Sequence, residues 1–69
     1  MILKSTQVFR KRENWLYPKW DIRIGGITIR KDVGVRKGSV SFIDMIFANW
    51  RKNLQVQTDG QVMVITGIY

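Results

Sequence analysis

The 69-residue chain is long enough for one domain, residues 1–69, and it contains no cysteine or histidine, which excludes disulfides and zinc sites built from thiolates or imidazoles. Hydrophobic residues make up 45% of the chain, which excludes a disordered basic tail. Twelve lysines and arginines against five acids give a net charge of +7, so a polyanionic partner would offset the protein's own charge repulsion.

The first predicted element is a strand from Ile2 to Arg12 at the edge of a sheet. Val8 and Phe9 favour a strand, and the basic run Arg10-Lys11-Arg12 at its end discourages pairing with another exposed edge. The chain reaches its first charge at Lys4, so we expect no signal peptide.

Residues 13–19 are predicted to form a loop that is rich in aromatic side chains. Pro18 favours an extended conformation at the preceding Tyr17. Trp15 and Tyr17 lie near Lys19, and exposed rings among cations are how single-stranded nucleic acids are stacked and held. The two rings are therefore candidates for base stacking, and the alternative is that they fill the core of a small domain.

The next segment predicts a β-hairpin, in which Trp20–Ile24 and Ile27–Arg30 flank a Gly25-Gly26 turn. This register places Ile22 and Ile24 opposite Ile29 and Ile27, and these four isoleucines form an apolar face together with Trp20. The other face is polar and mostly basic, with Arg23 opposite Thr28 and Asp21 opposite Arg30.

After a loop over residues 31–38, a helix is predicted from Val40 to Asn53. Ser41 and Asp44 fit a capping box at its beginning. An apolar stripe lies along one side of the predicted helix and consists of Phe42, Ile43, Ile46, Phe47, Trp50 and Leu54.

The chain ends in a second predicted hairpin, with strands Leu54–Gln57 and Gln61–Ile65 around an Asp59-Gly60 turn. The second strand is apolar on both faces, which favours a central strand or an edge that a partner covers. The predicted fold is therefore α+β, a small antiparallel sheet of four or five strands with two β-hairpins and one amphipathic helix packed on one face.

Catalysis is not expected. The acids are scattered along the chain, at Glu13, Asp21, Asp32, Asp44 and Asp59. Asp21 has a cross-strand arginine, Asp44 is a cap residue and Asp59 is a turn residue, so each of these three has a structural explanation. Without histidine or cysteine, acid–base and thiol mechanisms lack their usual groups, and no carboxylates cluster for a metal. We therefore expect no enzyme activity, no cofactor and no metal.

The candidate binding residues are basic. Arg23 and Arg30 share the polar face of the first hairpin and are expected to lie nearest any bases, and the other candidates are Arg10, Lys11, Arg12, Lys19, Arg36 and Lys37. The segment from Gly34 to Ser39 also combines cations, glycines and a helix beginning, which suits an anion site. The alternatives are a solvated hairpin face and an ordinary loop.

These observations predict a small nucleic-acid-binding module, with DNA as the first candidate, that contacts phosphates through a basic β-face and the loop before the helix. The alternative is a protein-interaction module or inhibitor, of the kind that a phage or mobile element encodes, that binds an acidic protein. The strand Gln61–Ile65 would suit strand addition or a homodimer. No run approaches the roughly 18 apolar residues of a membrane span, so a soluble, cytoplasmic protein without a membrane partner is expected.

Overall fold

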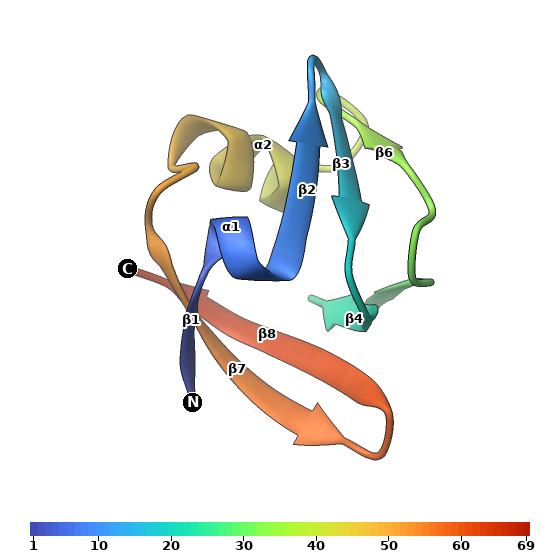
Figure 1. The fold of residues 1–69 in the computed structure, drawn as a ribbon, viewed down its shortest axis with the longest axis vertical. Coiled ribbons are helices and arrows are strands. Elements are labelled where there is room, and N and C mark those ends of the chain that lie inside the picture. The colour runs from blue at the N-terminus through green and yellow to red at the C-terminus, as the bar shows by residue number, and fades with distance from the viewer.

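A computed structural model describes all of residues 1–69. Its elements are β1 (Ile2–Lys4), α1 (Ser5–Val8), β2 (Phe9–Arg12), β3 (Trp15–Pro18), β4 (Asp21–Ile24), β5 (Ile27–Ile29), β6 (Val35–Arg36), α2 (Ser41–Ala48), β7 (Asn53–Asp59) and β8 (Val62–Ile68). The large sheet has the order β1-β7-β8-β4-β5, and the small sheet has the order β2-β3-β6. Figure 1 shows α2 beside β2 and partly behind it, with the β7–β8 hairpin at the other end of the molecule. The predicted α+β class is confirmed.

The β4–β5 hairpin forms in the predicted register, with Ile22 opposite Ile29 and Ile24 opposite Ile27. Gly25 and Gly26 both have positive φ, 54° and 85°, which is the conformation that a primed two-residue turn requires. The two glycines therefore determine this hairpin locally.

Strand β8 is the central strand of the large sheet, which is one of the two positions predicted for it. It pairs antiparallel with β7 and parallel with β4, so the expectation of a wholly antiparallel sheet is wrong at this pairing. Both hydrogen-bonding edges of Val62–Ile65 are occupied within the chain, since each of these residues has a partner in β4 and β7. Residues 62–65 therefore have no free edge to which a further strand could be added.

The predicted strand Ile2–Arg12 is interrupted by the one-turn helix α1, so β1 joins the large sheet and β2 the small one. The interruption is stabilised at Ser5, which is fully buried and whose backbone N–H and hydroxyl both donate to the Lys52 carbonyl at 3.1 Å. The Lys4 N–H donates to the Gln7 side chain at 2.9 Å. These contacts come from a distant segment and a local polar side chain, and strand propensity does not reveal them.

Residues 15–18 form a strand where a loop was predicted. β3 pairs antiparallel with β2 through a two-residue turn at Glu13 and Asn14, and Pro18 lies at its end opposite Phe9. A proline has no N–H to donate, and the end of a strand is a position that tolerates this loss.

Helix α2 is shorter than predicted, because it begins at Ser41 and ends at Ala48. Its N-cap residue is Val40 and no side chain caps it, so the predicted capping box is absent. The Asp44 carboxylate instead accepts a hydrogen bond from the Gly38 N–H at 2.6 Å. At the other end, the Asn49 side chain donates to the Met45 carbonyl at 2.9 Å, which satisfies a terminal carbonyl where the helix stops.

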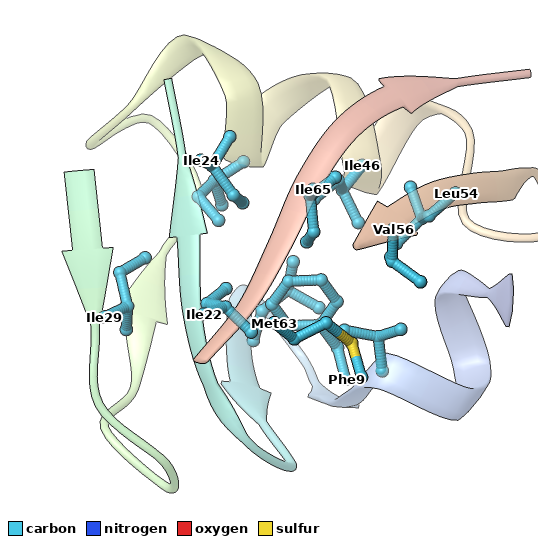
Figure 2. Packing of buried hydrophobic residues seen from close by; sticks show 12 residues of the cluster. Phe9, Ile22, Ile24, Ile29, Ile46, Leu54, Val56, Met63 and Ile65 are labelled. Atoms are coloured by element: carbon cyan, nitrogen blue, oxygen red, sulfur yellow. The ribbon is translucent and has the colours of Figure 1, made fainter. Parts of the chain in front are cut away.

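The hydrophobic core lies between the large sheet, α2 and the beginning of β2, as Figure 2 shows. Its buried members are Val8, Phe9, Leu16, Ile22, Ile24, Ile29, Ile43, Ile46, Leu54, Val56, Met63 and Ile65. The large sheet thus packs its isoleucine face against the apolar side of α2, as predicted. No helix has the length and apolar character to cross a membrane.

Two members of the predicted isoleucine–tryptophan face are exposed. Trp20 is 43% exposed and Ile27 is 44% exposed, whereas Ile22 is fully buried. Trp20 lies in a bend before β4, so the alternation of the strand does not extend to it. Ile27 is the first residue of β5, directly after the turn. Because β5 is an edge strand, no strand pairs with its outer side.

Candidate functional site

One face of the small sheet carries arginines and aromatic rings. The strand register aligns Arg12, Trp15 and Arg36 in a row across β2, β3 and β6, and it aligns Arg10 with Tyr17 in a second row. Cross-strand partners lie on the same face of a sheet, and alternate residues of one strand share a face. We call this surface, formed by Arg10, Arg12, Trp15, Tyr17 and Arg36, the arginine–aromatic face.

The opposite face of the small sheet packs on the core. Phe9, Leu16 and Pro18 are buried there, and Val35 packs against the same cluster. In Figure 1, α2 lies partly behind β2, and no other element crosses in front of β2 and β3. The side chains that alternate with the buried ones therefore project away from the core.

The two rings of the arginine–aromatic face meet at Gly34. A Cβ atom placed on Gly34 would lie 2.8 Å from Cε1 of Tyr17 and 3.1 Å from Cε3 of Trp15. Trp15 is 40% exposed, and Tyr17 is half-buried. The absence of a side chain at residue 34 therefore allows both rings to lie against the backbone beside β3.

The arginines of this face differ in their partners. Arg10 forms an ion pair with Asp32 at 2.9 Å, and both side chains are more than half exposed. The side chains of Arg12 and Arg36 form no ion pair and no hydrogen bond within the protein. Two guanidinium groups that flank Trp15 are therefore available to a ligand.

The candidate lysines lie around the same sheet. A hollow of about 760 Å³ runs beside β2 and is lined by Lys11, Lys19, Tyr17 and Trp50, among others. The Lys11 ammonium lies 5.7 Å from the centre of the Trp50 ring, a cation–π contact that holds its charge at the surface. Lys19 donates to the Thr6 carbonyl at 3.3 Å.

Lys37 lies near the tip of the β2–β3 hairpin. Its N–H donates to the Asn14 carbonyl at 2.7 Å, and its ammonium is 5.9 Å from the centre of the Phe47 ring. Lys11 makes a contact of the same length with Phe47. Cations therefore occupy both sides of the small sheet at this end.

Arg23 and Arg30 lie elsewhere, on the β4–β5 hairpin of the large sheet. Arg23 pairs with Asp59 at 3.4 Å, and Arg30 lies 3.9 Å from Asp21. The structure thus brings together Arg10, Arg12 and Arg36 with the two aromatic candidates, and it does not bring the hairpin arginines to that group.

The predicted anion site before α2 uses one of its N–H donors within the protein. The Gly38 N–H donates to Asp44, and the Ser39 hydroxyl donates to the Arg36 carbonyl. The Asp44 carboxylate would therefore compete with a bound anion for the Gly38 N–H.

Sequence reasoning missed Gly34 as a site residue. The available signal was the pattern of residues 15–18, in which exposed rings alternate with the buried Leu16 and Pro18, as in a half-buried strand.

No group of three acidic residues lies close enough to hold a metal ion. Comparison with protein-family models, with curated proteins and with solved structures gave no match.

Proposed function

We propose that this protein is a non-catalytic nucleic-acid-binding module and that the arginine–aromatic face is its interface. The observation that carries the proposal is the row in which Arg12 and Arg36, both without internal partners, flank the exposed Trp15. Guanidinium groups bind phosphate oxygens in a bidentate manner, and aromatic rings bind the faces of bases. DNA is the first ligand to test, and a cytoplasmic location is part of the proposal.

The distribution of acids supports this choice of surface. Asp21 and Asp59 lie beside Arg30 and Arg23 on the large sheet, which reduces the positive charge there. On the small sheet only Arg10 has an acidic partner. Arg12 and Arg36 therefore remain unpaired on the small sheet, where Lys11, Lys19 and Lys37 add to the positive charge.

The positions of the acids also support a role without catalysis. Asp44 accepts the Gly38 N–H, Asp21 accepts the Lys31 N–H at 2.7 Å, and Glu13 lies in the β2–β3 turn. The remaining two form ion pairs with arginines. Four of the five carboxylates thus have a hydrogen-bond or ion-pair partner, and no three acidic residues gather in one place.

The alternative is binding of an acidic protein through the same face. Tryptophan, tyrosine and arginine dominate the energetics of protein interfaces, so the residues that carry the first proposal also fit this one. The two candidates differ in their ligands and in their salt dependence, because nucleic-acid binding releases condensed counterions from the phosphate backbone. Neither requires a second copy of the chain, because one chain forms the whole arginine–aromatic face.

The test compares two double variants that remove the same charge. Arg12→Gln with Arg36→Gln removes the flanking arginines of Trp15, and Arg23→Gln with Arg30→Gln removes the arginines of the other sheet. Affinity for labelled DNA and RNA oligonucleotides would be measured by fluorescence anisotropy over a range of salt concentrations. Circular dichroism would check that both variants are folded.

We expect the Arg12/Arg36 variant to lose roughly tenfold in affinity and to reduce the slope of log K against log salt by about 1.5, since about two phosphate contacts are lost. The Arg23/Arg30 variant should lose less than about threefold. Equal losses of affinity in the two variants would mean that nucleic acid binds to the positive charge of the protein as a whole, without a defined interface. If no nucleic acid bound saturably, the alternative function, binding of an acidic protein, would be favoured.

A further inference from the structure

We infer that the ligand of the arginine–aromatic face is a single strand whose unpaired bases stack on Trp15 and Tyr17, in preference to a duplex. This inference rests on the proposed function and specifies the form of nucleic acid that the face accepts. It follows from the positions of the rings and from the shape of the small sheet.

Trp15 lies on the central strand of the small sheet and its indole is 40% exposed. The indole N–H donates no hydrogen bond within the protein, and part of the ring stays exposed between Arg12 and Arg36, the residues opposite Trp15 on the two neighbouring strands. A flat apolar ring between two cations matches the chemistry of an unpaired nucleotide, which has a flat aromatic base attached to an anionic phosphate.

Tyr17 provides a second position for a base. It lies two residues beyond Trp15 on β3, a rise of about 7 Å along the strand, and Arg10 is its partner on β2. The two rows thus repeat the same arrangement of an aromatic residue beside an arginine. Gly34 positions both rings by leaving the space beside them free of a side chain.

A duplex does not use this arrangement. Its bases are stacked on one another, so their faces are covered, and only groove edges and phosphates are accessible. The major groove is about 12 Å wide and admits a helix or a two-stranded ribbon. Here β2 and β3 have β6 beside them and α2 against their other face, and a sheet with a helix packed on it is too thick for the groove.

The experiment measures the anisotropy of a labelled thymidine-rich single strand and of a duplex with the same sequence, at near-physiological salt. The variants are Trp15→Leu, which removes the aromatic ring, and Trp15→Phe, which retains one. Trp20→Leu is the matched control, because Trp20 is similarly exposed, at 43%, and precedes a strand of the other sheet. Thermal unfolding would be recorded for each variant.

We expect the wild-type protein to prefer the single strand by about tenfold or more. Trp15→Leu should weaken single-strand binding by about tenfold and leave duplex binding within about twofold, Trp15→Phe should retain most of the affinity, and Trp20→Leu should not change it.

Equal affinity for both forms, with no effect of Trp15→Leu, would overturn the inference. If the Arg12/Arg36 variant still lost affinity in that case, the proposed function would stand, with phosphate contacts alone. If neither form bound saturably, the inference and the proposed function would both fail.

Discussion

Gly34 lies against the ring of Tyr17 so closely that a Cβ atom at residue 34 would be 2.8 Å from Cε1 of that ring. The φ of Gly34 is not in the left-handed region, so the backbone conformation does not require a glycine. The requirement is the lack of space for a side chain beside the two rings. Gly34→Ala should therefore displace the rings of Tyr17 and Trp15, destabilise the protein by about 1–3 kcal/mol, and weaken single-strand binding. Urea unfolding and anisotropy would measure the two effects.

Gly67→Ala is the control for this prediction. Residue 67 is also a glycine in a strand, and its nearest neighbour would lie at 3.8 Å, an ordinary van der Waals distance. The control should leave affinity unchanged. If Gly34→Ala and Gly67→Ala had the same affinity for the single strand, the close approach of the rings to Gly34 would have no consequence for binding.

Asp32→Asn should strengthen nucleic-acid binding by roughly threefold, because it releases Arg10 from an exposed ion pair and removes an anion beside the interface. The residue has a φ of +64°, which asparagine tolerates well, so the backbone should be preserved. Asp59→Asn makes the same charge change beside Arg23 on the large sheet and should have a smaller effect. If both variants gained the same affinity, the cause would be the overall net charge of the protein and not the local release of Arg10.

Glu13→Asn should stabilise the protein by about 0.5–1 kcal/mol. Glu13 has a φ of +54° in the β2–β3 turn, a conformation that is unfavourable for most side chains and acceptable for asparagine. Glu13→Gln removes the same charge and keeps the unfavourable backbone, so its unfolding midpoint in urea should stay below that of Glu13→Asn. Identical midpoints would show that the turn is not strained.

Ile22→Ala should destabilise the protein by about 2–5 kcal/mol, since Ile22 is fully buried and lies between β5 and β8. Ile27→Ala on the same hairpin should cost less than about 1 kcal/mol, because Ile27 is 44% exposed. Chemical denaturation of the two variants measures the difference. Similar losses would contradict the packing of the large sheet.

The sequence correctly indicated elements that depend on neighbouring residues. The Gly25-Gly26 turn and the alternating isoleucines specify the β4–β5 hairpin, because turn geometry and side-chain alternation act over a few residues. The apolar positions of α2, including Ile43 and Ile46, were likewise evident from their spacing.

Elements that depend on distant contacts were missed. The interruption at α1 relies on hydrogen bonds from Ser5 to Lys52, and the early end of α2 leaves Trp50 outside the helix. Residues 15–18 contain a proline, which favours a loop by local rules, yet pairing with β2 makes them a strand.

For the candidate site, the sequence by itself determined which residue types are present, namely arginines, lysines and two aromatic residues without histidine or cysteine. Only the tertiary structure decided which of them meet. Trp15 and Arg36 are neighbours because β3 pairs with β6, and Arg23 has Asp59 as a partner because β4, β8 and β7 lie side by side. The physical reason is that burial of the apolar faces selects the pairing of strands that are far apart in the chain, and the charged side chains on the outer faces follow that selection.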